Sequence, residues 1–203
     1  MTVPLSSRAA GELVAARARA APHGRPALVA LEGPAGAGKT TLAAQRADAS
    51  GPLGPAAVVH GDGFLRPLPW PDRLAMTPHQ GYLRLFAWQR LRDQVLVPLR
   101  AGRAARYERY DPAVNGLRPD RPGRVAPAGT VIVAGVLTAR PELAACYDVI
   151  VFVDTPGEVC LRRLHARGTD ARRLAWIRTW QAVERHCFAA TAARERAHVT
   201  VTR

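Results

Sequence analysis

Lysine is nearly absent from this sequence. Lys39 is the single lysine among 29 lysine and arginine residues, and the arginines are spread along the whole chain. A lysine ammonium is a compact point charge that a planar guanidinium does not replace. We therefore interpret Lys39 as a residue whose position requires an ammonium group.

Cysteine and metal-ligating patterns are also scarce. The three cysteines, Cys146, Cys160 and Cys187, are an odd number at spacings that suit neither a disulfide framework nor a zinc site. We expect them to be buried or inert thiols. The 6 histidines show no metal-ligand spacing, and we interpret His60 as a packed residue at a strand end rather than a ligand. No Ser/His/Asp or Cys/His arrangement can be recognised from spacing.

Long apolar runs are missing as well. Strongly apolar stretches such as residues 130–137 are far too short to cross a bilayer, and residues 1–10 lack the basic and apolar segments of a secretory signal. We therefore expect a cytoplasmic protein without a membrane partner. Its 203 residues suit one α/β domain that buries a sizeable core without disulfides or metals.

Acidic residues are few, so the formal net charge is +13, a value that raises the question of nucleic-acid binding. The arginines form no basic run, however, and no helix-turn-helix, zinc or aromatic-stacking signature accompanies them. Dispersed charge of this kind is more typical of a solvated surface. We do not expect a nucleic-acid partner.

Short apolar runs alternate with helix-like patterns along the chain. Strands are predicted at residues 26–32, 56–60, 130–136 and 148–154, with a last alternating strand at 197–202. Helices are predicted at residues 6–21, 39–50, 78–99, 156–167 and 172–191, and the aromatic residues of 78–99 are expected in the core. This pattern favours a parallel sheet with helices on both faces. Residues 103–127, rich in Arg, Pro and Gly, are predicted to be an irregular functional insertion.

Residues 33–40 match the phosphate-loop pattern G-x-x-x-x-G-K-[ST] between a predicted strand and a predicted helix. Its glycines let successive backbone N–H groups converge on phosphate oxygens, and the following helix adds its positive end. Lys39 is expected to reach the β- and γ-phosphates of ATP, and the Thr40 hydroxyl to bind Mg²⁺. The predicted nucleotide-binding residues are Gly33, Pro34, Ala35, Gly36, Ala37, Gly38, Lys39, Thr40 and Thr41. A glycine-rich turn without a ligand is the alternative.

Two further features suggest phosphoryl-transfer chemistry. Asp62 follows the second predicted strand, at the sheet edge where the phosphate loop emerges, and is our candidate for the base that assists a hydroxyl acceptor. A turn aspartate in Gly-Asp-Gly is the alternative. Arg163 and Arg167 lie four residues apart on a predicted helix and could close over the transferred phosphoryl group, or form a solvated helix face.

Together these residues resemble the uridine kinase-like and phosphoribulokinase-like branch of P-loop kinases, in particular short bacterial uridine kinase-like proteins. The resemblance covers about residues 26–201. The similar segments are residues 33–40, 61–67, 82–91, 109–111, 133–136, 140–143 and 160–168. The resemblance implies a three-layer α/β sandwich with a five-stranded parallel sheet, Mg²⁺ and ATP as cofactors, and a small-molecule hydroxyl acceptor such as a nucleoside. It also implies that Asp62 is the base and that Arg163 and Arg167 lie in a mobile lid.

The same resemblance implies the organisation of the chain. We expect one P-loop kinase domain over residues 1–203, with an N-terminal helix in 1–25, acceptor-site insertions at about 62–127 and a lid at about 160–175. A homo-oligomer remains open. The expected acceptor-side residues are Asp62, Phe64, Arg66, Tyr82, Tyr110 and Asp111.

Three positions depart from the family pattern. Gly63, Ala87 and Ala134 stand where the family usually has acidic residues, of which the last helps to hold Mg²⁺ and the second contacts an acceptor hydroxyl. Alanine at 134 is expected to weaken metal binding, with Glu32 or Asp154 as candidate substitutes. Two hypotheses follow: an active kinase, or a catalytically impaired ATP-binding protein that acts through conformation or partner binding.

Overall fold

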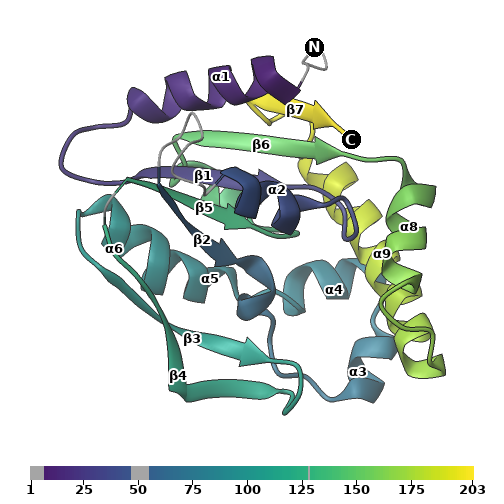
Figure 1. Ribbon diagram of the computed structural model, residues 1–203. Helices are drawn as coiled ribbons and strands as arrows, with labels where there is room; N and C mark the ends of the chain where they lie inside the picture. The colour runs from purple at the N-terminus through teal and green to yellow at the C-terminus, as the bar shows by residue number, and fades with distance from the viewer. Residues whose placement is uncertain (1–6, 47–54, 128) are drawn as a thin grey trace.

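In a computed structural model, which describes residues 7–46, 55–127 and 129–203, the chain is built around one parallel sheet (Figure 1). The sheet has five strands in the order β2-β5-β1-β6-β7. Their bounds are β1 Ala27–Glu32, β2 Ala56–His60, β5 Thr130–Ala134, β6 Val149–Asp154 and β7 Val199–Thr202. Each pair of neighbouring strands is parallel. The predicted α/β fold with a five-stranded parallel sheet is therefore confirmed.

The central strands β1, β5 and β6 are mainly apolar because they are buried on both faces of the sheet. In β1, Leu28 and Ala30 belong to one core cluster, whereas Val29 and Leu31 belong to the cluster on the other face. Successive strand residues point to opposite faces, so a continuous apolar run fits a sheet with two cores. This burial explains why short apolar runs in the sequence predicted the positions of these strands.

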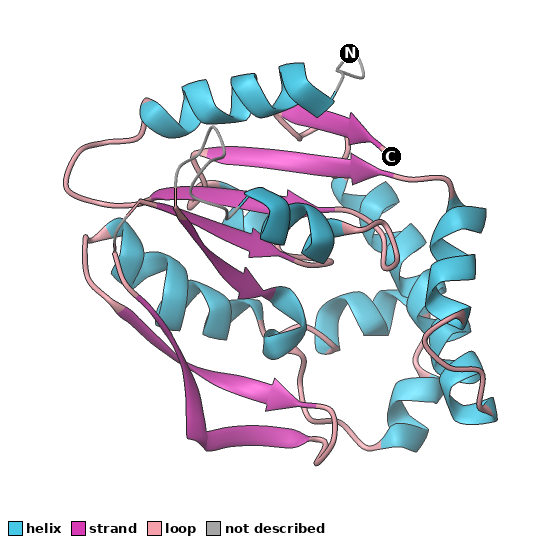
Figure 2. Cartoon of the chain, viewed as in Figure 1, coloured by secondary structure: helices cyan, strands magenta, loops and turns pink. Residues whose placement is uncertain are grey.

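Helices cover both faces of the sheet (Figure 2). One core cluster includes residues of α1, α2 and α8, and the other includes residues of α5, α6 and α9. The helices and helical turns are α1 Ser7–Arg19, α2 Lys39–Arg46, η1 Gly61–Phe64, α3 Trp70–Ala75, α4 Pro78–Arg84, α5 Trp88–Leu91, η2 Arg92–Leu96, α6 Val97–Arg100, α7 Pro141–Ala144, α8 Gly157–His165 and α9 Ala171–Thr191. None of the helices in these described segments is long and apolar enough to cross a membrane.

Most predicted helices are present with shifted ends. The helices expected at 156–167 and 172–191 are α8 and α9, and those expected at 6–21 and 39–50 are α1 and α2. Residues 6 and 47–50 lie outside the described residues. All three cysteines are free, and Cys160 and Cys187 are buried as expected. Burial raises the pKa of the Cys187 thiol to about 12, consistent with an inert group.

The single long helix predicted over residues 78–99 is wrong. The chain forms α4, leaves the helix at residues 85–87, and then continues through α5, η2 and α6. At the break, the Arg66 N–H donates to the Leu85 carbonyl at 2.9 Å and the Ala87 N–H donates to the Phe64 carbonyl at 2.8 Å. Phe86 thereby forms an isolated antiparallel bridge with Leu65. These long-range backbone bonds replace helical ones, which local periodicity cannot reveal.

The prediction of irregular structure over residues 103–127 is also wrong. This segment forms an antiparallel hairpin of β3 Ala105–Asp111 and β4 Gly116–Val125, with a register shift between Tyr107 and Arg109. Its prolines are tolerated because each strand pairs on one side only in this two-stranded sheet. Tyr107 stacks on Phe64 with ring centroids 5.2 Å apart, which attaches the hairpin to η1.

Candidate active site

The candidate site lies at the carboxyl edge of the parallel sheet. The phosphate loop follows β1, and η1 follows β2. Because β5 lies between β1 and β2 in the sheet, the segment after β5 lies between the phosphate loop and η1 (Figure 1). In open α/β sheets, ligands bind at this edge. A cleft of about 240 Å³ opens here, which we call the phosphate-loop cleft, and its lining includes Lys39, Thr40, Asp62, Ala134, Arg167 and Trp176.

The phosphate loop wraps around the ammonium of Lys39. Its Nζ donates to the carbonyls of Gly33 and Pro34, both at 2.7 Å. Lys39 is only 8% exposed, and burial lowers its pKa, while Glu184, Glu32 and Asp62 act in the opposite direction. A buried cation with nearby carboxylates but no direct ion pair is suited to an anionic ligand.

Donors from other parts of the chain hold the loop carbonyls. Thr155 Oγ1 donates to the Ala37 carbonyl at 3.1 Å, the Arg163 guanidinium to the Gly36 carbonyl at 3.1 Å, and the Arg203 guanidinium to the Gly38 carbonyl at 3.3 Å. These bonds fix the loop from outside.

The loop also offers unused donors. Within the described residues, the backbone N–H groups of Gly36 and Gly38 have no protein acceptor. Both glycines have positive φ, 83° and 90°, which is the backbone form that turns successive N–H groups to one side. These donors, together with the Lys39 ammonium, fit the phosphates of a nucleotide.

Glu184 of α9 supports the loop from the opposite direction. Its carboxylate is buried and accepts a hydrogen bond of 2.9 Å from the Ala35 N–H. Burial raises the pKa of Glu184 to about 7, although Ala35 and Lys39 both favour the ionised form. A titratable group therefore contacts the backbone of the phosphate loop directly.

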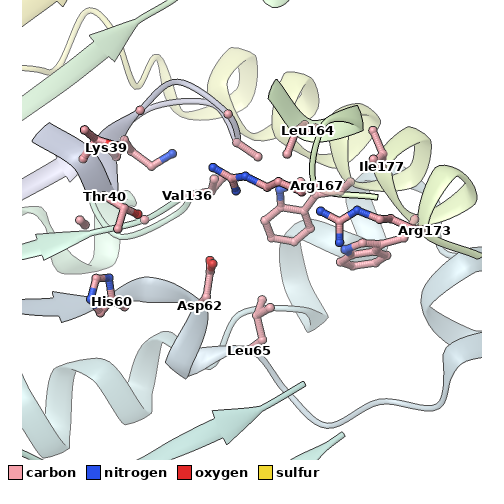
Figure 3. A pocket seen from close by; sticks show the side chains of 18 residues that line it. Lys39, Thr40, His60, Asp62, Leu65, Val136, Leu164, Arg167, Arg173 and Ile177 are labelled. Atoms are coloured by element: carbon pink, nitrogen blue, oxygen red, sulfur yellow. The ribbon is translucent and has the colours of Figure 1, made fainter. Parts of the chain in front are cut away.

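Asp62 lies across the phosphate-loop cleft from Lys39 and Thr40, on η1 (Figure 3). Its side chain is exposed and points into the cleft. Of the described residues that line the cleft, Asp62 is the only carboxylate. The structure therefore brings together Lys39, Thr40, Asp62 and Arg167, four of the residues that sequence reasoning selected.

A second cavity of about 670 Å³ lies between η1 and the β3–β4 hairpin, and we call it the hairpin cavity. It shares five lining residues with the phosphate-loop cleft, namely His60, Asp62, Leu65, Arg173 and Trp176. Asp62 thus lies where the two cavities meet. The interpretation of His60 as a packed residue is wrong, because its side chain is exposed and lines both cavities.

Tyr110, one of the predicted acceptor-side residues, lines the hairpin cavity. The remaining predicted acceptor-side residues line neither of the two cavities: Phe64, Arg66, Tyr82 and Asp111. Phe64 is fully buried in the core, and Asp111 pairs with Arg118 at 3.3 Å. In this structure, the motifs that contain Phe64 and Asp111 therefore hold η1 and the hairpin in place.

Arg66 and Tyr82 also have other partners. The Arg66 guanidinium donates to the Gln89 side chain at 3.3 Å. Tyr82 lies under the Arg140 guanidinium, 4.4 Å from the ring centroid. Both contacts join the segment around α4 and α5 to its neighbours.

The donors available for a divalent cation are few. Among the described residues, no group of three or more His, Cys, Asp or Glu side chains could hold a metal ion. Glu32 accepts hydrogen bonds from the N–H groups of Leu137 at 2.8 Å and Ala139 at 2.7 Å. Asp154 pairs with Arg194 at 2.7 Å. Both candidate substitutes for the family glutamate therefore have other partners.

The oxygen donors of the cleft are nevertheless of the kind that Mg²⁺ accepts. Thr40 contributes a hydroxyl and Asp62 a carboxylate, and both line the phosphate-loop cleft. Mg²⁺ in nucleotide sites takes one or two protein oxygens, with phosphate oxygens and water completing its coordination. The residues present fit a Mg²⁺ ion that arrives with a nucleotide.

Sequence reasoning missed one face of α9. Arg173, Trp176, Ile177, Trp180 and Glu184 follow at helical spacing, and the first four line the phosphate-loop cleft. The fifth contacts the phosphate loop through Ala35. The spacing of these residues within 172–191 was an available signal, because a buried acid and two tryptophans on one helix face do not fit a simple apolar core.

Comparison with protein-family models found no match, and comparison with curated proteins found none either. Solved structures do match over nearly the whole chain. A proposed uridine kinase from Bacillus stearothermophilus is 18% identical with a TM-score of 0.69, over 96% of this chain and 98% of that one. A proposed fructose transport system kinase from Silicibacter sp. is 24% identical with a TM-score of 0.68, over 97% of each chain.

A third structure, the D-glycerate 3-kinase from Cryptococcus neoformans, is 16% identical with a TM-score of 0.59, over 89% of this chain and 87% of that one. At these identities the comparisons establish the fold. The resemblance to uridine kinase-like proteins, which the motifs predicted, agrees with it. The chain therefore has the fold of the P-loop kinases.

Proposed function

We propose that this protein is an ATP-dependent kinase that transfers the γ-phosphoryl group to a hydroxyl of a nucleoside-like or related small metabolite. The observation that carries the proposal is that Lys39, Thr40, Asp62 and Arg167 line one cleft at the carboxyl edge of the sheet. These are the side chains that phosphoryl transfer needs: a phosphate-binding ammonium, a hydroxyl for the metal, a base and a second cation.

The donor side of the reaction is assigned to the phosphate loop. Lys39 and the N–H groups of Gly36 and Gly38 bind the phosphates of ATP, and Thr40 holds Mg²⁺. The bound Mg²⁺ supplies positive charge that neutralises the phosphate oxygens. Because the loop carbonyls are tied from outside, the loop keeps its form without the nucleotide and pays little reorganisation cost on binding.

The acceptor side is assigned to Asp62. Its carboxylate accepts the hydroxyl proton as the acceptor oxygen forms a bond to the γ-phosphorus and the bond from that phosphorus to the leaving ADP oxygen breaks. Arg167 stabilises the charge on the transferred group from the opposite wall (Figure 3). Arg163 takes part only if its side chain leaves the Gly36 carbonyl, as a lid movement would allow.

One observation favours the second hypothesis, a nucleotide-binding protein without efficient transfer. Ala134 ends β5 inside the phosphate-loop cleft, and Asp62 is the only carboxylate among the described residues of that lining. If the Asp62 carboxylate binds Mg²⁺, it no longer serves as the base for the acceptor hydroxyl. In this hypothesis nucleotide binding acts through the loop and its contact with Glu184.

Nucleotide titration and acceptor-dependent ADP release distinguish the hypotheses. The purified protein is titrated with ATP and Mg²⁺, and ADP release is then measured over nucleosides, sugars and hydroxylated natural products. Lys39→Ala should lose nucleotide binding, whereas Gln45→Ala, on the exposed face of the same helix, should bind as the wild type does. Binding with acceptor-dependent ADP release supports the kinase.

The other outcomes are equally decisive. Binding without ADP release for any acceptor supports the second hypothesis. Unchanged nucleotide affinity in Lys39→Ala overturns both, because each requires the phosphate loop to hold the nucleotide.

A further inference from the structure

The hairpin cavity is strongly basic. Arg109 of β3, Arg124 of β4 and Arg173 of α9 all line it, and Asp62 is the only carboxylate among the described lining residues. With three arginines and one acidic residue, the lining residues of this cavity carry an excess of positive charge. Asp62 occupies the end that opens toward the phosphate-loop cleft.

These three arginines differ from others in the chain. Arg25, Arg118 and Arg140 each form an ion pair with a carboxylate at 3.3 Å or less. Within residues 7–46, 55–127 and 129–203, the guanidinium groups of Arg109, Arg124 and Arg173 have no such partner. Unpaired arginines are expected in a basic chain, but these three all line the same cavity.

Arg173 provides a second and independent observation. Its Nε atom is buried and has no hydrogen-bond partner. A buried donor without an acceptor costs free energy, unless a ligand supplies the acceptor. Arg173 lines both cavities and lies in the first turn of α9, where its backbone N–H donates to the capping side chain of Asp170 at 3.0 Å.

The arginines stand on a fixed framework. Tyr107 of β3 stacks on Phe64 of η1, and the Tyr110 hydroxyl of the same strand accepts a hydrogen bond of 2.8 Å from the buried Arg73 guanidinium. The hairpin is thereby held against η1 and α3. The backbone positions of Arg109 and Arg124 are therefore set relative to Asp62, which favours a defined binding site.

We infer that the hydroxyl acceptor carries an anionic group, a carboxylate or a phosphate ester, bound by Arg109, Arg124 and Arg173 in the hairpin cavity while its hydroxyl faces Asp62. Guanidinium groups bind both anions through paired N–H donors, and an anion offsets the excess positive charge of the lining residues. The volume of about 670 Å³ suits a small metabolite. This inference rests on the proposed function and narrows its substrate class.

The test uses matched acceptors that differ in one group. The wild-type protein, saturated with ADP and Mg²⁺ to occupy the phosphate loop, is titrated calorimetrically with glycerol, glycerate and glycerol phosphate, and with ribose, ribonate and ribose 5-phosphate. ADP release from ATP is measured with the same compounds. Comparing carboxylate with phosphate members shows which anion the site takes.

Arginine variants test whether the anionic compound binds in the hairpin cavity. Arg109→Gln, Arg124→Gln and Arg173→Gln should each weaken binding of the anionic compound roughly 10-fold or more, because each loses a charge-assisted contact. Arg178→Gln is the matched control, since Arg178 is an exposed arginine of α9 that lines neither the hairpin cavity nor the phosphate-loop cleft. The affinity for ATP should stay within about 2-fold in Arg109→Gln and Arg124→Gln and in the control, because these residues do not line the phosphate-loop cleft.

Each outcome has one meaning. Tighter binding of a charged member, lost in the three variants and kept in Arg178→Gln, supports the inference. Equal binding of neutral and charged members, or equal losses in Arg178→Gln, overturns it. If ADP release occurs with neutral acceptors and the variants do not change it, the kinase stands and the inference falls. If the anion binds with arginine dependence but no acceptor releases ADP, the proposed function falls instead.

Discussion

The Glu184 carboxylate accepts a hydrogen bond of 2.9 Å from the backbone N–H of Ala35, which joins a buried acid on α9 to the phosphate loop. The two residues are 149 positions apart in the chain. Lys39 lies close enough that its charge favours the ionised form of Glu184. The ionisation of one carboxyl group therefore affects the part of the molecule that is proposed to bind the nucleotide.

The raised pKa of Glu184 predicts a pH dependence of stability. Burial raises its pKa from 4.5 to about 7, so the folded protein holds the proton more tightly than the unfolded chain. The resulting stabilisation is complete below pH 4.5 and is lost as the pH rises through about 7. Glu184→Gln should remove this loss, which amounts to roughly 3 kcal/mol at most.

Urea unfolding of wild type and Glu184→Gln at several pH values between 4 and 8 measures the effect. Glu195→Gln serves as the control, because Glu195 is exposed. The glutamine can still accept from the Ala35 N–H, so the loop contact is kept. Parallel pH profiles for wild type and Glu184→Gln would contradict the prediction.

Asp62→Asn should separate binding from chemistry. The amide keeps the size of the side chain but accepts no proton, so we expect kcat to fall roughly 10²- to 10⁴-fold while ATP affinity changes little. Steady-state ADP release and nucleotide titration measure the two effects. Asp93→Asn is the control, because Asp93 is exposed and pairs with Arg92 on η2. A variant at 62 that keeps most of its kcat removes Asp62 from the role of base.

Ala134→Glu should strengthen the binding of Mg²⁺. Ala134 ends β5 in the lining of the phosphate-loop cleft, so a carboxylate there adds a charged oxygen donor near Thr40 and Asp62. The Mg²⁺ concentration for half-maximal turnover should fall roughly 10-fold. Ala134→Gln has the same size without the charge and should show no such gain. Equal behaviour of the two variants would show that position 134 does not serve the metal.

Gly36→Ala should destabilise the phosphate loop. A Cβ at Gly36 would lie 2.5 Å from the Cys160 carbonyl oxygen, and its φ of 83° disfavours alanine in any case. We expect a loss of about 1–3 kcal/mol in unfolding free energy and weaker nucleotide binding. Gly63→Ala is the matched change, because a Cβ there meets no atom within 4 Å, and its stability should stay within about 0.5 kcal/mol. Thermal and urea unfolding of both variants give the comparison.

Features of the candidate site differ in how far local sequence revealed them. The phosphate loop was recognisable because its chemistry is carried by consecutive residues, with glycines where positive φ is needed and Lys39 at the start of α2. Asp62 was recognisable because it lies two residues after the end of a short apolar strand. The break in the predicted helix over 78–99 was not, since it depends on backbone bonds from residues near 85–87 to the segment after η1.

The amino-acid pattern alone specified the α/β class and the phosphate loop, because both follow from apolar runs and backbone conformation over a few adjacent residues. The tertiary structure decided the long-range contacts of the candidate site. Glu184 reaches Ala35, and Arg109, Arg124 and Arg173 share one cavity, only because a hairpin and a late helix pack against the edge of the sheet. In a chain with 29 lysine and arginine residues, composition cannot single out the three that line one cavity, since sharing a cavity depends on long-range packing.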